Sequence, residues 1–253
     1  METMNWSSRR KFFYSLLVLI ALSALVAPLV YYFYPKPSCF DGKQNQDEAG
    51  IDCDGSCAKV CVERTSPLKV LFTRQFLVSN NVYSVVAFVG NPNATLGAKN
   101  VPYIFKLYDE RNILVAERRG STDVLPGTSF PVFEGLIAAG ARAPIRAFFE
   151  FTRTPHFERL PDQPLLSVRN TQFDDTDPPR LTATIVNQNI FQVQDISVVV
   201  MLYDAKDTVI AASQTLLDTI EKNGSAEVVF TWPQKLASPV GRIEIFPKFL
   251  KVQ

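Results

Sequence analysis

Two segments of the chain repeat one pattern, and they read FKLYDERNILVAE at residues 105–117 and VMLYDAKDTVIAA at residues 200–212. At an offset of 95, the shared residues are Leu107, Tyr108 and Asp109 in the first copy and Leu202, Tyr203 and Asp204 in the second. Each copy has an apolar run, a short polar turn and a second apolar run, which predicts a β-hairpin. We expect Asp109 and Asp204 to open the turns, because a short carboxylate accepts backbone N–H bonds there.

The repetition extends beyond the hairpins. An Asn-rich connection precedes each one, at residues 90–93 and 187–189, and similar segments follow at 127–133 and 224–230. Elsewhere, short runs of Val, Ile, Phe, Tyr and Thr are broken by turn residues, which is typical of strands. The run LTATIV at residues 181–186 alternates apolar and polar positions, as a strand with one wet face does.

The sequence therefore predicts an all-β fold with two tandem antiparallel β-sandwiches, at residues 66–153 and 165–253. A domain of about 90 residues is large enough to bury its own core. Residues 154–164 are rich in proline, and we expect them to form an extended, semi-rigid linker.

The Leu-Tyr-Asp motifs at 107–109 and 202–204 make the two units resemble the FxLYD-type domain, an immunoglobulin- or fibronectin-like sandwich of bacterial and archaeal envelope proteins. Phe105 holds the aromatic position of the motif in the first unit, and Val200 departs from it in the second. The resemblance implies Ig-like modules in a cell envelope, and the family carries no general enzymatic role.

Residues 12–33 contain no charged side chain, and roughly 20 apolar residues suffice to cross a bilayer as a helix. We predict a single-pass transmembrane anchor at residues 12–34. Arg9, Arg10 and Lys11 precede it, so residues 1–11 should stay cytoplasmic and the bulk of the chain should lie outside the cell membrane. A cleaved signal peptide is the alternative, but its apolar region is usually about 7–15 residues long.

Residues 35–65 form a cysteine-rich, acidic segment. It holds all the cysteines of the chain, which are Cys39, Cys53, Cys57 and Cys61. An even number of clustered cysteines outside a membrane predicts two disulfides, with three pairings open. The string CFDGKQNQDEAGIDCDGSC at residues 39–57 is similar to a short cysteine motif of exported bacterial surface proteins, which implies an exported location.

The same segment offers oxygen ligands from Asp41, Asn45, Glu48 and Asp52, a candidate calcium site because Ca²⁺ binds six to eight oxygens in flexible geometry. Their spacing departs from the EF-hand pattern. The alternative is an acidic turn in which these side chains cap their own backbone.

The balance of 26 basic against 25 acidic residues argues against nucleic-acid binding. One histidine, His156, and the lack of phosphate-binding or hydrolase motifs indicate a protein that is not an enzyme. The prediction is a membrane-anchored structural or interaction protein, with an envelope protein or a surface glycan as partner and no cofactor besides the candidate calcium. A surface hydrolase that uses paired carboxylates is the alternative.

Overall fold

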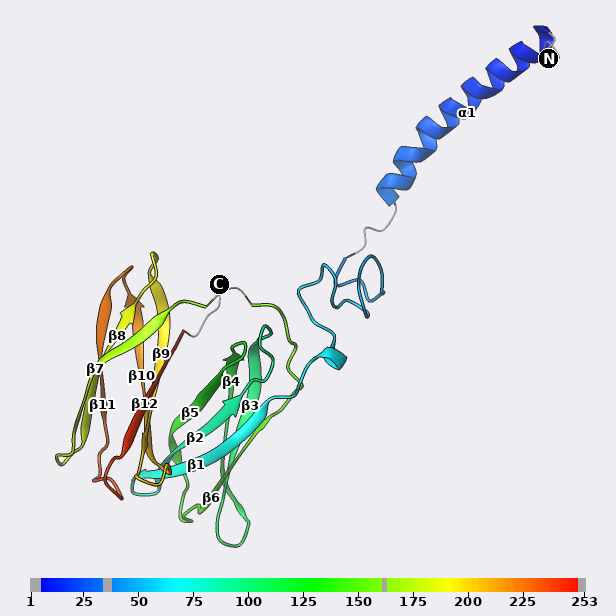
Figure 1. Ribbon diagram of the computed structural model, residues 1–253. Coiled ribbons are helices and arrows are strands. Elements are labelled where there is room, and N and C mark those ends of the chain that lie inside the picture. Colours follow the sequence, from blue (N-terminus) through cyan, green and yellow to red (C-terminus); the bar gives the residue numbers. More distant parts are fainter. Residues whose placement is uncertain (1–5, 34–37, 161–162, 250–253) are drawn as a thin grey trace. The chain divides into compact units, whose positions relative to one another are not determined.

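The computed structural model describes residues 6–33, 38–160 and 163–249 (Figure 1). The chain divides into two compact units, Met1–Ser56 and Cys57–Gln253. The parts of the predicted segments that fall on residues 1–5, 34–37, 161–162 and 250–253 lie outside the described residues. The described residues form an N-terminal helix, a disulfide-linked loop and antiparallel sheets, which confirms the predicted fold class.

The helix α1 spans Trp6–Phe33 and contains most of the predicted anchor. Its segment Arg10–Leu29 has a mean hydropathy of 2.3, and no part of its apolar stretch is buried inside the protein. Such a helix is long and apolar enough to cross a membrane, and a signal sequence near an N-terminus has the same character.

The second unit holds two β-sandwiches, each built from two three-stranded antiparallel sheets. The strands of the first are β1 (Lys69–Ser79), β2 (Val82–Gly90), β3 (Ala98–Tyr108), β4 (Leu114–Val124), β5 (Ser129–Ala138) and β6 (Arg146–Phe151). Those of the second are β7 (Leu166–Asp174), β8 (Arg180–Asn187), β9 (Val193–Tyr203), β10 (Val209–Ile220), β11 (Ser225–Thr231) and β12 (Arg242–Phe249).

The two sandwiches have the same topology. The first has the sheet orders β1-β2-β5 and β4-β3-β6, and the second has β7-β8-β11 and β10-β9-β12, so the six strands of one copy correspond in sequence order to those of the other. Leu107 and Leu202 are fully buried, each in the core of its own sandwich. On β8, Leu181, Ala183 and Ile185 are buried and alternate with less buried residues, as the sequence pattern predicts. The internal duplication is thus visible in the fold.

The predicted aspartate turns are confirmed in both copies. Oδ1 of Asp109 accepts hydrogen bonds from the backbone N–H groups of Arg111 and Ile113, each at 2.9 Å. Oδ1 of Asp204 accepts the corresponding bonds from Lys206 and Thr208, at 2.8 and 2.9 Å. The carboxylate therefore fixes the hairpin turn by capping donors that the strands leave unpaired.

A second duplicated feature lies in the Asn-rich connections. Asn187 is fully buried, and its amide donates to the carbonyl oxygens of Phe191, Ile220 and Glu221. Its Oδ1 accepts from the backbone N–H of Asn189 at 3.0 Å. In the first sandwich, Asn91 donates to the carbonyls of Leu96 and Leu125 and accepts from the N–H of Asn93. Each buried asparagine thus satisfies backbone groups that a crossing loop leaves inside the fold.

The sandwiches pack face to face through a third buried cluster. Val86 of β2 and Met201 of β9 are fully buried there, and partly buried rings surround them, among them Phe88 and Phe246, whose centroids lie 5.6 Å apart. The sheet β1-β2-β5 therefore meets the sheet β10-β9-β12. The contact between the modules is therefore apolar.

The segment between the sandwiches has no strand in its described residues, as expected for a linker, yet it is packed rather than free. Phe157 is 4% exposed and belongs to the core of the first sandwich. Its carbonyl accepts from the N–H of Val60 at 2.9 Å, and Glu158 pairs with Gly97 through two backbone hydrogen bonds. His156 is exposed.

Candidate functional site

All four predicted disulfide cysteines, Cys39, Cys53, Cys57 and Cys61, are disulfide-bonded. Gly55 in the same segment has a φ of 60°, and an added Cβ would lie 2.3 Å from the carbonyl oxygen of Asp47. Only glycine fits such a turn without a backbone shift.

The four residues predicted as calcium ligands are linked by hydrogen bonds within the Met1–Ser56 unit. The carboxylate of Asp52 accepts from the backbone N–H groups of Asp41 and Gly42, at 3.1 and 2.9 Å. Asn45 Nδ2 donates to Asp41 at 2.9 Å, and this bond lowers the pKa of the Asp41 carboxyl. Glu48 accepts from the N–H of Asn45 at 3.1 Å.

These contacts have the character of backbone capping, which is the alternative to a calcium site. The carboxylates of Asp41, Glu48 and Asp52 already accept N–H donors, so a cation would compete with those bonds. Oδ1 of Asn45, in contrast, is buried without a hydrogen-bond partner in the described residues. Calcium binding at this loop stays a hypothesis.

The tyrosines of the repeat lie outside the sandwich cores. Tyr203 is buried against the other sandwich, donates its hydroxyl hydrogen to Glu244 at 2.7 Å and lies under the guanidinium of Arg242, 3.8 Å from the ring centroid. Burial and Glu244 raise the pKa of Tyr203 well above its ordinary value. Tyr108, at the equivalent place in the first copy, is only partly buried and belongs to neither core cluster. The tyrosines are thus part of sheet faces and do not form a ligand platform.

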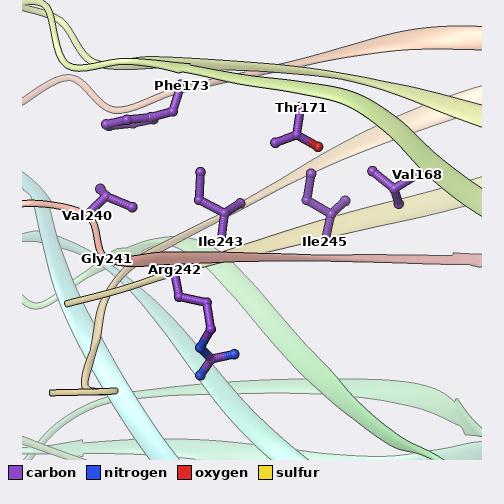
Figure 2. A pocket seen from close by; sticks show the side chains of 8 residues that line it. All are labelled: Val168, Thr171, Phe173, Val240, Gly241, Arg242, Ile243 and Ile245. Atoms are coloured by element: carbon purple, nitrogen blue, oxygen red, sulfur yellow. The ribbon is translucent and has the colours of Figure 1, made fainter. Parts of the chain in front are cut away.

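A groove of about 570 Å³ lies in the second sandwich between strands β7 and β12, a feature that the sequence did not predict. It is lined by Val168, Thr171, Phe173, Val240, Gly241, Arg242, Ile243 and Ile245. Figure 2 shows Val168, Thr171 and Phe173 facing Ile243 and Ile245 across this space, while Arg242 points away from it. Most of the lining side chains are aliphatic or aromatic, while polar atoms contribute at least as much of the exposed lining as apolar atoms do.

The groove is explained by comparing the two copies. In the first sandwich, Phe105 on β3 is paired across the sheet with Phe149 on β6, and their rings lie 4.9 Å apart inside the core. In the second, the corresponding cross-strand pair is Val200 and Ile245. The aliphatic pair has less side-chain volume than the two rings, which agrees with the open space beside Ile245.

Both strands beside the groove are sheet edges. Within the described residues, β12 pairs with β9 and β7 pairs with β8, and each has no strand on its other side. Their unpaired backbone N–H and C=O groups are therefore available to a further strand. Apolar pockets beside a free edge are the combination that strand addition requires.

No family model matches the chain, and no curated protein matches it either.

Proposed function

We propose that the protein is a non-enzymatic, membrane-anchored interaction protein. In this proposal α1 holds it in the cell membrane with its N-terminus in the cytoplasm, and two Ig-like modules of the FxLYD type stand outside. The partner is another envelope protein that adds an extended strand along β12 and inserts alternate apolar side chains into the groove of the second sandwich.

The observation that carries the proposal is the open groove with aliphatic and aromatic side chains beside the free edge of β12. Its wall of Val168, Ile243 and Ile245 suits aliphatic side chains of a polypeptide better than the hydroxyl groups of a glycan. The part of β12 that precedes Pro247 has backbone N–H groups to offer, whereas proline has none.

No observation favours the hydrolase alternative. That alternative needs two carboxylates in a cleft, and the space between the sandwiches is where such a cleft would lie. Two recesses lie there, one beside Lys248 and one beside Trp232, and no Asp or Glu is found among their described lining residues.

Photo-crosslinking in cells that produce the full chain tests the proposal. A photoreactive amino acid replaces Thr171 at the groove and, as the control, Glu117, which is exposed on β4 of the other sandwich. We expect a discrete adduct with one protein from position 171 only. The adduct should disappear when Ile245→Phe fills the groove. An adduct that persists in the filled variant, or no adduct at all from position 171, would refute the proposal.

A further inference from the structure

A second cavity, of about 300 Å³, lies between the two sandwiches. Strands β4 and β5 of the first sandwich and β9, β10 and β12 of the second line it. Most of its wall is apolar and includes Phe130, Phe133, Val199 and Phe246. A cavity with such walls at a module interface is a favourable place for a small ligand.

The charged group of this cavity is the ammonium of Lys248, near the end of β12. Its Nζ donates to Thr122 Oγ1 at 2.7 Å and to the carbonyl oxygen of Asp123, both on β4 of the other sandwich. It also lies 4.8 Å from the centroid of the Phe130 ring. Lys248 therefore reaches from one module into the other at the wall of the cavity.

The ammonium has no full counter-charge. Within the described residues, Lys248 forms no ion pair with a carboxylate, although Asp123 exerts a weaker attraction on it. The Asp123 carboxylate is itself engaged by the backbone N–H of Asn100 at 2.7 Å. Burial lowers the pKa of Lys248 to about 8, which shows how poorly this environment compensates the positive charge.

Other polar groups in the wall are hydroxyl and amide groups without charge. Gln214 Nε2 donates to Ser197 Oγ at 2.6 Å, and Thr122, Thr128 and Ser129 add further hydroxyls. The cavity therefore combines one cationic donor, a few neutral hydrogen-bonding groups and a large apolar surface. A ligand that matches it has an anionic head and an apolar body.

We propose that this cavity binds a small apolar monocarboxylate, with its carboxylate on Lys248 and its hydrocarbon part between the phenylalanine rings. A carboxylate supplies the counter-charge that the described residues do not, and an enclosed ion pair is stronger than one in water. The cavity shares Ile245 with the groove beside β7, but Lys248, Thr122 and the phenylalanine rings belong to the cavity alone, so the proposal does not depend on the proposed strand binding.

Octanoate is the test ligand, and octan-1-ol is its uncharged match. The full chain, in lipid nanodiscs and with ¹³C-labelled methyl groups of Thr and Ile, is titrated with each at pH 7, and empty nanodiscs correct for partition into lipid. We expect octanoate to bind at least tenfold more tightly than octanol. The methyl signals of Thr122 and Thr128 should shift, and those of Ile243, which lines only the groove, and Ile113, at the other end of β4, should stay in place.

Two variants test whether the ammonium of Lys248 binds the carboxylate of octanoate. Lys248→Met keeps the apolar stem and removes the ammonium, and it should weaken octanoate binding at least tenfold while leaving octanol unaffected. Lys106→Met, on the sheet of β3, should change neither. Equal affinity for octanoate and octanol, or no saturable shift at Thr122 below 10 mM octanoate, would overturn the proposal. Both results come from the unaltered protein and hold even if Lys248→Met fails to fold.

Discussion

Met201 on β9 holds the position that Lys106 holds on β3, since the two follow the same register at an offset of 95 residues. Met201 is fully buried between the sandwiches, whereas Lys106 forms an ion pair with Glu150 on a partly exposed face. Phe246 on β12 and Glu150 on β6 also hold equivalent positions in the two copies. Phe246 packs in the interface between the sandwiches, whereas Glu150 is the partner of Lys106 in the ion pair. The same sheet of the fold is thus apolar in the copy where it is covered and charged in the copy where it is not.

In the other pair of equivalent sheets, β1-β2-β5 and β7-β8-β11, the apolar face belongs to the first copy and the polar face to the second. Val86 and Phe88 on β2 belong to the interface, and the equivalent residues on β8 are Thr182 and Thr184, which lie outside the core. The first sandwich therefore uses its β2 sheet for the contact, and the second uses its β9 sheet. If every copy had both of these apolar faces, the same contact could repeat from copy to copy and build a filament. The polar outer faces have the character of the capping repeats of solenoids.

We predict that Met201→Lys separates the sandwiches. It places an uncompensated charge in the buried interface and should lower the free energy of unfolding by about 3–5 kcal/mol. Lys106→Met, which only adds an apolar group to an outer face, should change it by less than about 1 kcal/mol. Urea unfolding of both variants provides the measurement, and equal losses would show that the interface does not distinguish these positions.

Much of this fold is predictable from local patterns. The Leu-Tyr-Asp repeat predicts paired hairpins because the aspartate turn depends on residues within five positions of each other. The packing of the modules also has a signal in the sequence. The runs VYSVVAFVG of β2 and ISVVVMLY of β9 are apolar on both faces, unlike the alternating LTATIV of β8. Strands covered on both faces have this character, and β2 and β9 are the central strands that meet.

The groove and the cavity were beyond prediction from sequence. The departure at Val200 is visible in the sequence, but its effect depends on Ile245, which pairs with it from 45 positions further along the chain. The contact from Lys248 to Thr122 spans 126 residues and two modules. Neither relationship follows from a local period.

Asn187→Ala should be among the most damaging single changes in the second sandwich. It removes an amide that donates to three carbonyl oxygens inside the fold, and unsatisfied buried groups of this kind cost about 1–3 kcal/mol each. We expect a loss of roughly 2–4 kcal/mol in urea unfolding. Gln188→Ala, at the exposed neighbouring position, is the control and should change stability by less than about 0.5 kcal/mol. A loss below 1 kcal/mol for Asn187→Ala would contradict the role assigned to its amide.

Calcium should bind the acidic loop no more tightly than millimolar, because Asp41, Glu48 and Asp52 already accept hydrogen bonds from backbone N–H groups. Titration calorimetry of the full chain in nanodiscs, first with EGTA and then with Ca²⁺, measures this directly. Micromolar affinity that is lost in Asp52→Asn would instead establish the calcium site.

Ile245→Phe should fill the groove of the second sandwich by restoring the ring that Phe149 supplies in the first. Cavity filling of this kind raises stability by about 0.5–2 kcal/mol. Val198→Phe is the matched control, since Val198 is fully buried in the same sandwich and does not line the groove. Its extra volume should lower stability by about 1–3 kcal/mol. Equal destabilisation by both changes in urea unfolding would argue that the groove is not free space.

The stability of the second unit should rise between pH 8 and pH 10. The pKa of Lys248 is about 8 in the folded protein and 10.5 in the unfolded chain, so in this interval the unfolded chain binds more protons and stability increases with pH. Below pH 8 the buried, charged lysine lowers the free energy of unfolding by its full amount. Deprotonation of Lys248 between pH 8 and pH 10 should restore roughly 2–3 kcal/mol of it. Tyr103 and Tyr203 have raised pKa values and act in the opposite direction from about pH 9 upward, because unfolded tyrosine, with a pKa near 10, ionises before the folded residues do. Urea unfolding of the wild type and of Lys248→Met at pH 7, 8, 9 and 10 isolates the effect. The rise should be absent in the variant, and a rise of equal size in both proteins would assign it to other groups.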